Sequence, residues 1–379
     1  MKVLIAPDKF KGSLSAGEVA DRLAAGLARA GASSTQLPLA DGGDGSVDAA
    51  IAAGFTPHQV TVAGATGHSH SATLAFNEGT VLVEVANTCG LATLPDNAGD
   101  ALGASSLGLG QAIRAGLQLG KRRMVLALGG SASTDGGMGM LTALGHVFRD
   151  TAGHALQPSG RNMSLVHTVD STHALDLRDI DVVVATDVTN PLTGPIGAAT
   201  VYGPQKGASD DDVRLLDAGL DNLVATFERS GHPRASQIAG SSGAGSAGGI
   251  GFAAMILGGH VVSGAGYFLD LLDFDNALTG VDLVITGEGS IDDQTEHGKL
   301  LTVLIDRARP TPVIGVAGRT TLPRDRWSVN GFEWIYALAD LTTENTSRDP
   351  ALTRRLLEHI GHKIALNHDA RLTSADASA

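Results

Sequence analysis

The chain has 379 residues, of which 43% are hydrophobic and 18% are charged, and 50 are glycine. This composition predicts a globular α/β protein of two domains with many tight turns. The formal charge of −13 argues against a nucleic-acid or anionic membrane surface, because both need clustered basic residues. Cys89 is the only cysteine, which excludes an intrachain disulfide, and no segment has the apolar length of a membrane span, so we expect a cytoplasmic protein.

The N-terminal segment has the pattern of a strand, a loop and a helix. Residues 3–6 are apolar, and Ser15 with Glu18 forms a capping box before an amphipathic helix. The loop between them carries residues that suit an anion near a helix N-terminus: Asp8, Lys9, Lys11 and Ser13.

A second strand is predicted at residues 36–39, followed by a glycine-rich loop and a helix from about Ser46. In this loop Asp41 and Asp44 flank Gly42 and Gly43, a pattern that suits hydrated Mg²⁺ or a polyol, although turn capping explains one aspartate equally well. From residue 56 to residue 85 short alternating segments predict antiparallel strands, and the change of pattern places a domain boundary near residue 55.

The segment from Met124 to Gly139 is the most informative part of the chain. An apolar strand, 124–128, runs into a loop with one carboxylate, and the loop precedes another helix. Glycines allow close approach of a ligand, while hydroxyls and free N–H groups favour an anion. The candidate ligand-binding residues of this loop are Gly130, Ser131, Ser133 and Asp135.

Another apolar strand is predicted at residues 181–185, and it ends just before Asp187 and Asn190. Polar groups at the carboxyl end of a buried strand are typical of α/β active sites. Lys206 follows in a rigid turn and could meet a phosphate. Residues 243–248 match G-x-G-x-x-G, but no convincing strand precedes them, so a hinge or helix entry is an equal alternative to a dinucleotide site.

After residue 260 the chain returns to strand and helix alternation, with strands near 283–285, 313–316 and 334–337 and a closing amphipathic helix. A further strand-end loop, 286–295, is rich in glycine and carboxylates. Together the strand-end loops supply carboxylates, lysines and backbone N–H groups, which are the parts that phosphoryl transfer needs. A Walker A loop is absent from the sequence.

Six segments carry a resemblance to a known family: APDKFKGSLSA (6–16), ADGGDGS (40–46), GGSASTDGGMG (129–139), ATDVTNPLTGPIGA (185–198), GPQKGA (203–208) and ITGEGSIDDQT (285–295). In this order they resemble the bacterial glycerate kinase family. The resemblance implies that ATP and Mg²⁺ are used to phosphorylate D-glycerate to 2-phospho-D-glycerate, in a cleft between two domains. The chain departs from the family at Ser290, where relatives commonly carry arginine.

The resemblance further implies a flavodoxin-like α/β domain, residues 1–55 plus 262–379, and an inserted mixed α/β domain, residues 56–261. The partners it implies are D-glycerate and ATP. The charge and the lack of a long apolar segment, as argued from the composition, predict no nucleic-acid and no membrane partner. The oligomeric state stays open.

We hypothesise that Lys9, Lys11 and Ser13 hold an anionic group and that Lys206 neutralises the transferring phosphoryl group. Asp187 is the candidate base, or it orients the acceptor hydroxyl. Candidate Mg²⁺ ligands are Asp41, Asp44 and Asp292, and further binding candidates are Asp8, Gly42, Gly43, Gly130, Ser131, Ser133, Asp135, Asn190, Gly287, Glu288, Gln294 and Thr295. A nicotinamide-dependent oxidoreductase and a non-catalytic sugar-acid-binding protein are the alternatives.

Overall fold

The computed structural model describes residues 1–94, 99–292 and 299–376. The chain divides into two compact units, which are described separately. Unit 1 comprises Met1–Asp41, Asp48–Ala53 and Ala265–Ala379, and unit 2 comprises Gly42–Val47 and Gly54–Gly264. Residues 42–47, which the sequence places in the first domain, thus group with unit 2.

Unit 1 is built on a parallel sheet with the strand order β2-β1-β11-β12-β13. This is the flavodoxin-like order: from β1 the next strand along the chain, β2, lies on one side, and the later strands β11, β12 and β13 follow on the other side. The α/β fold class is therefore confirmed. The strands are β1 (Lys2–Pro7), β2 (Ser33–Gln36), β11 (Leu283–Ile291), β12 (Val313–Thr320) and β13 (Trp334–Ala337).

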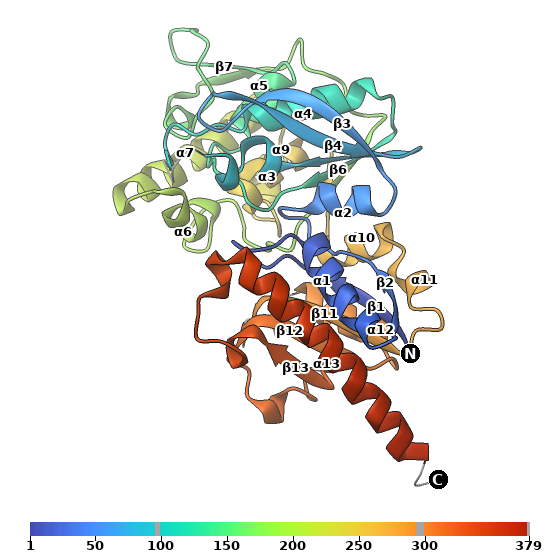
Figure 1. Ribbon diagram of the computed structural model, residues 1–379. Helices are drawn as coiled ribbons and strands as arrows, with labels where there is room; N and C mark the ends of the chain where they lie inside the picture. Colours follow the sequence, from blue (N-terminus) through green and yellow to red (C-terminus); the bar gives the residue numbers. More distant parts are fainter. Residues whose placement is uncertain (95–98, 293–298, 377–379) are drawn as a thin grey trace. The chain divides into compact units, whose positions relative to one another are not determined.

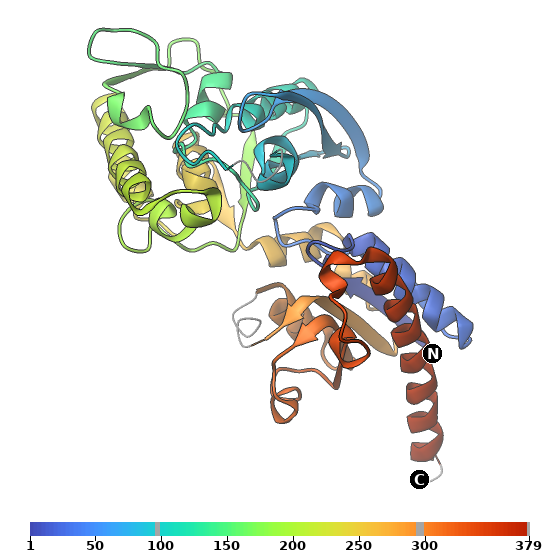
Figure 2. The same ribbon diagram turned by 60° about the vertical axis from the view of Figure 1, so that its left-hand side comes forward.

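Two long helices pack together on this sheet, α1 (Ala16–Arg29) and α13 (Pro350–Asp376). They lie side by side in Figure 1 (blue and red) and in the turned view of Figure 2. Close packing of the two helices requires Gly26 and Gly361. A Cβ on Gly26 would lie 2.1 Å from a backbone oxygen of α13, and a Cβ on Gly361 would lie 2.3 Å from a backbone oxygen of α1. The predicted capping box at Ser15 and Glu18 is present at the start of α1.

The remaining helices of this part of the chain are short: α2 (Ser46–Ala52), α10 (Gly264–Leu271), α11 (Phe274–Ala277) and α12 (Lys299–Ala308). The hydrophobic core of unit 1 lies between the sheet and the α1 and α13 helices, where Leu23, Leu27, Leu357 and Ile360 are buried.

Unit 2 contains a mixed sheet with the order β10-β9-β6-β5-β4-β3. The first four strands are parallel, and β4 and β3 complete the sheet as the predicted antiparallel strands. Because the parallel strands share one direction, the loops after β5, β6, β9 and β10 lie at one edge of the sheet. The strands are β3 (Thr56–Ala63), β4 (Ser69–Phe76), β5 (Thr80–Glu84), β6 (Arg123–Ala127), β9 (Asp181–Ala185) and β10 (His260–Val262).

Seven α-helices cover this sheet and its loops in the described part of unit 2, and a small hairpin of β7 (Val147–Arg149) and β8 (Thr168–Asp170) flanks them. The helices are α3 (Val85–Cys89), α4 (Leu107–Gln118), α5 (Met138–Ala143), α6 (Ala198–Tyr202), α7 (Asp210–Arg229), α8 (Ala235–Ala239) and α9 (Ile250–Ile256). Within the described residues, no helix has the length and apolar character needed to cross a lipid bilayer.

Two predicted element boundaries are wrong. Strand β2 ends at Gln36 rather than starting there, although the N–H groups of Leu37 and Leu39 still donate to β1 beyond its end. Strand β11 continues to Ile291, because Ser290 and Ile291 pair with β12. Most of the predicted loop from residue 286 is therefore strand, despite its glycines.

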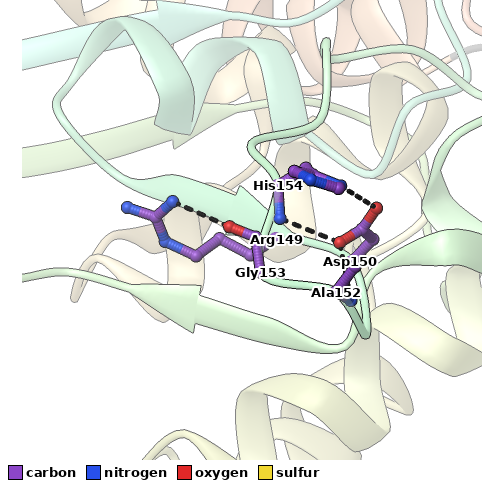
Figure 3. A network of polar contacts seen from close by, with 5 residues as sticks. All are labelled: Arg149, Asp150, Ala152, Gly153 and His154. Atoms are coloured by element: carbon purple, nitrogen blue, oxygen red, sulfur yellow. Dashed lines mark hydrogen bonds and ion pairs between the residues drawn. The ribbon is translucent and has the colours of Figure 1, made fainter.

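The turn after β7 shows how an exposed aspartate organises backbone (Figure 3). Asp150 accepts hydrogen bonds of 2.9 Å from the N–H groups of Ala152 and His154. The hydrogen bond from His154 N–H is the main cause that lowers the pKa of Asp150. This carboxylate is occupied by its own turn, which makes it a useful control residue below.

Candidate functional site

The loop after β6 carries the densest set of polar groups in unit 2. It is held against the glycine-rich loop of residues 42–46, because Gly129 N–H donates to the carbonyl oxygen of Gly42 at 3.0 Å. A Cβ on Gly129 would lie 2.5 Å from the Cα of Gly43. Glycine is thus required at these positions so that the two predicted ligand loops can touch.

Asp135 is fully buried at the base of this loop. Its carboxylate accepts hydrogen bonds from Ser106 N–H at 2.7 Å, Ser106 Oγ at 2.8 Å, Gly139 N–H at 3.0 Å and Gly137 N–H at 3.1 Å. Burial raises the pKa of Asp135, and these hydrogen bonds offset part of that effect. The observed contacts join the loop to the starts of α4 and α5, while the predicted contact of Asp135 with a ligand stays a prediction.

Lys206 reaches the same loop from the short 3₁₀ turn Pro204–Lys206. Its side chain is buried, and Nζ donates to Ser131 Oγ at 2.8 Å and to the carbonyl oxygen of Ser133 at 2.6 Å. Burial lowers the pKa of Lys206 to about 8, against the opposing influence of Asp135 and Cys89. The structure therefore brings together Lys206, Ser131 and Ser133, which the sequence separates by more than 70 positions.

Two further hydroxyl groups of this loop have no hydrogen-bond partner. Ser133 Oγ and Thr134 Oγ1 are both buried and both lack one. Buried polar atoms are rarely left in this state in folded proteins. They are therefore two donors of this loop that the protein itself does not use.

Glu84 anchors the loop of residues 42–46 from the end of β5. Its buried carboxylate accepts from Val47 N–H at 2.8 Å and Gly45 N–H at 3.3 Å. This loop presents Asp44 at the surface. Asp41, which precedes the loop and belongs to unit 1, is half-buried. Glu84 is not among the residues predicted from the sequence, although a charged residue at the end of an apolar strand indicates a special role.

Asp187 follows β9 at the same sheet edge, as predicted. Ser263, which follows β10, donates its hydroxyl to Asp187 Oδ1 at 3.0 Å and was also missed. Asn190 lies nearby in sequence but serves its own loop: it donates to the carbonyl oxygen of Ile196 and accepts from the Tyr202 hydroxyl, both at 2.8 Å. A direct role for Asn190 in binding would compete with these contacts.

Unit 1 holds the other predicted residues at the carboxyl ends of β1 and β11. Asp8 N–H donates to the carbonyl oxygen of Gly287, so the two strand ends are adjacent. Asp8 Oδ1 accepts from Lys9 N–H at 2.7 Å, and Ser13 Oγ is buried without a partner. This point of the sheet, where the strand order reverses, is where flavodoxin-like folds bind ligands.

The end of β11 brings Glu288 and Asp292 to the same region of unit 1. Asp292 Oδ2 accepts from the Ser290 hydroxyl at 3.1 Å, and Arg319 Nε donates to Ser290 Oγ at 3.3 Å. A guanidinium group is thus present beside Ser290, supplied by the neighbouring strand β12. The predicted residues Gln294 and Thr295 lie outside the described residues.

The described residues include no group of three or more His, Cys, Asp or Glu that could hold a metal ion. Of the candidate Mg²⁺ ligands, Asp44 belongs to unit 2, whereas Asp41 and Asp292 belong to unit 1. Mg²⁺ in kinases is held largely by nucleotide phosphates and waters, with one or two protein carboxylates. Each of these aspartates has the carboxylate chemistry that this mode needs.

The G-x-G-x-x-G match at residues 243–248 is a packing segment. It follows α8, whereas a dinucleotide fingerprint needs a preceding strand. A Cβ on Gly245 would lie 2.3 Å from the carbonyl oxygen of Pro191, and one on Gly248 would lie 2.2 Å from that of Ser133. These glycines let the segment support two of the candidate loops, and they do not form a nucleotide site of Rossmann type.

Comparison with known proteins agrees with this arrangement. Residues 3–368 match the model of the glycerate kinase family. A glycerate kinase of Bacillus subtilis (strain 168) is 37% identical over 89% of this chain and 90% of its own length, and a glycerate 2-kinase of Escherichia coli (strain K12) is 37% identical over 85% and 86%.

A crystal structure of a candidate glycerate kinase 2 from Salmonella typhimurium LT2 superposes with a TM-score of 0.82 at 34% identity, covering 98% of this chain and 99% of that one. The similarity thus spans both units and all the loops described above. The chain belongs to the glycerate kinase family.

Proposed function

We propose that this chain transfers the γ-phosphoryl group of ATP to D-glycerate and releases 2-phospho-D-glycerate and ADP. The observation that carries the proposal is the buried ammonium group of Lys206, 2.8 Å from Ser131 Oγ beneath a loop with two unpaired hydroxyls, in a member of the glycerate kinase family. The choice of the 2-hydroxyl is supported by the name of the Escherichia coli relative.

The reaction forms a bond between the acceptor oxygen of glycerate and the γ-phosphorus, and it breaks the bond between that phosphorus and the bridging oxygen of ADP. The proton of the acceptor hydroxyl must leave during this step. Asp187 is the proposed acceptor of that proton or, because an ordinary carboxylate is a weak base, the group that orients the hydroxyl. The hydrogen bond from Ser263 holds its carboxylate in place.

The loop 129–135 and Asp44, both in unit 2, have complementary proposed roles. Hydroxyl and N–H donors of the loop would bind phosphate oxygens, and Asp44 would be a ligand of the Mg²⁺ that arrives with ATP. Asp41 in unit 1 is a further candidate ligand. The ion would supply neutralisation of the phosphate charge. Asp292 stays a candidate Mg²⁺ ligand in unit 1. It accepts a hydrogen bond from the Ser290 hydroxyl, and the same Ser290 oxygen accepts from the Arg319 guanidinium.

In unit 1, Lys9, Lys11 and Ser13 are proposed to hold an anionic group of the substrate or of the nucleotide. The support is the unpaired buried hydroxyl of Ser13 and the position of the loop where the strand order reverses. Gly287 and Glu288 belong to the same strand ends. The cleft expected from the family resemblance stays a prediction.

The test is release of ADP from ATP and Mg²⁺ on addition of D-glycerate, measured with a coupled enzyme assay. Turnover that depends on D-glycerate supports the kinase. Binding of glycerate without ADP release would favour a non-catalytic sugar-acid-binding protein. A glycerate-dependent change in nicotinamide absorbance would favour the oxidoreductase, which the packing of residues 243–248 argues against.

A further inference from the structure

The buried contacts of Lys206 determine the direction of a hydrogen bond. An ammonium group has three donors and no acceptor, so Ser131 Oγ must accept from Lys206 Nζ at 2.8 Å. The hydroxyl proton of Ser131 must then be donated elsewhere. Among the described residues no acceptor takes it.

The surroundings of Ser131 indicate where that proton is directed. Ser131 is 4% exposed and directly follows Gly130, an exposed residue with φ of 79°. Gly130 has no side chain to cover the neighbouring hydroxyl. The unpaired hydroxyls of Ser133 and Thr134 belong to the same loop. The loop thus offers several hydroxyl groups and lacks acceptors for them.

We propose that Lys206 is a positioning residue that acts through Ser131: its buried ammonium group makes the Ser131 hydroxyl a fixed donor to an anionic ligand oxygen. That oxygen belongs either to a phosphate of the nucleotide or to the carboxylate of the acceptor. The inference rests on the proposed function, and it replaces direct contact of Lys206 with the transferring phosphoryl group.

Burial argues for this indirect role. The Lys206 side chain is 2% exposed, and two of its three donors are already used by Ser131 Oγ and the carbonyl oxygen of Ser133. The charged or titratable groups that act on it are Asp135 and Cys89, and both belong to the surroundings of the loop. Only one donor of Nζ is left for a direct contact with a phosphoryl group, whereas the Ser131 hydroxyl proton has no partner within the described residues.

The test is a double-mutant cycle of Ser131→Ala and Lys206→Met, with Ser236→Ala as the exposed serine control. We expect each single variant to raise the KM of one substrate about 10- to 100-fold, as for loss of a hydrogen bond to a charged group, with a smaller change in kcat. The double variant should lose little beyond the worse single variant. A KM effect on ATP identifies the phosphate as the ligand, and one on D-glycerate identifies the carboxylate.

The proposal would be overturned in favour of direct contact if the KM effects of the two single variants multiplied in the double variant. A large loss of kcat confined to Lys206→Met would overturn it in the same way. A second readout needs no Lys206 variant. When the ammonium group loses its proton above about pH 8, it can accept from Ser131 and the hydroxyl can reverse. The KM of the affected substrate should therefore rise with pH in the wild type and stay flat in Ser131→Ala; equal profiles would contradict the inference.

Failure of the proposed function is distinguishable from failure of this inference. If the wild type shows no glycerate-dependent turnover, the function fails. The positioning role is then read from calorimetric binding of ATP and of D-glycerate, measured separately; both single variants should weaken the binding of the same one of these ligands by a similar factor. Unchanged binding of both ligands in the variants, or binding of neither by the wild type, would overturn it in that case.

Discussion

Replacement of Asp135 tests whether the carboxylate holds the β6 loop together. In Asp135→Asn the amide oxygen can take the place of Oδ2 and keep the hydrogen bonds from Ser106 and Gly139. The amide nitrogen then faces Gly137 N–H, and two donors oppose each other. In Asp135→Ala all five donors, including Ser105 Oγ at 3.5 Å, lose their acceptor and a cavity is left.

The magnitude follows from the number of unsatisfied buried donors. One such donor costs about 1–3 kcal/mol, so Asp135→Asn should destabilise by about that amount, even after relief of the buried charge. Loss of the whole carboxyl group in Asp135→Ala leaves all of these buried donors without an acceptor, so it should cost more, about 4 kcal/mol or above. The alanine variant should therefore be clearly less stable than the asparagine variant.

Chemical denaturation followed by circular dichroism and by tryptophan fluorescence measures these losses. The two tryptophans of the chain, Trp327 and Trp334, both lie in unit 1, so fluorescence reports that unit while circular dichroism reports the whole chain. We expect the transition of unit 2 to shift to lower denaturant. Two variants with wild-type stability, or equal losses in both, would refute the assigned role of the carboxylate.

Three further outcomes are expected. Asp187→Asn should lower kcat about 10²- to 10⁴-fold in steady-state kinetics, with little change in KM. The control Asp150→Asn, in the turn after β7, should leave both constants unchanged. Wild-type turnover of Asp187→Asn would show that Asp187 takes no part in the chemical step. Glu84→Gln should lower the free energy of unfolding by about 1–3 kcal/mol, because its amide nitrogen would face Gly45 N–H or Val47 N–H. It should also raise the Mg²⁺ concentration needed for half-maximal activity. Unchanged stability and Mg²⁺ dependence would contradict the anchoring role. Burial lowers the pKa of His146 to about 4 from 6.5, with a smaller contribution from His232. The unfolded chain therefore binds a proton at this histidine first as the pH drops, and the free energy of unfolding should fall between pH 6.5 and pH 4. Denaturation of His146→Gln should show a weaker fall over this range, and a fall as steep as in the wild type would contradict the role of His146.

The sequence was sufficient to predict those features that local pattern controls. The capping box at Ser15, the strands before Asp187 and the loop after β6 all follow from periodicity and turn residues within a few positions. The extension of β11 could not be predicted in this way. It depends on pairing with β12, which lies 29 positions away at Ser290 and Arg319.

Supporting residues were missed for the same physical reason. Ser106 and Glu84 act through hydrogen bonds to groups 29 to 39 positions away, and no local pattern reports such contacts. Lys206 was found because its turn is distinctive, but its burial beneath Ser131 is a consequence of tertiary packing. The sequence thus predicted which groups take part more readily than how each is held.

Phosphorus NMR of the product formed from ATP, Mg²⁺ and D-glycerate tests the central claim most directly, because one spectrum reports activity, acceptor and position. We expect ADP together with a single new phosphomonoester resonance that matches 2-phospho-D-glycerate. ATP left unconsumed in the presence of D-glycerate would contradict the proposed kinase, and a resonance matching 3-phospho-D-glycerate would contradict the proposed position of transfer.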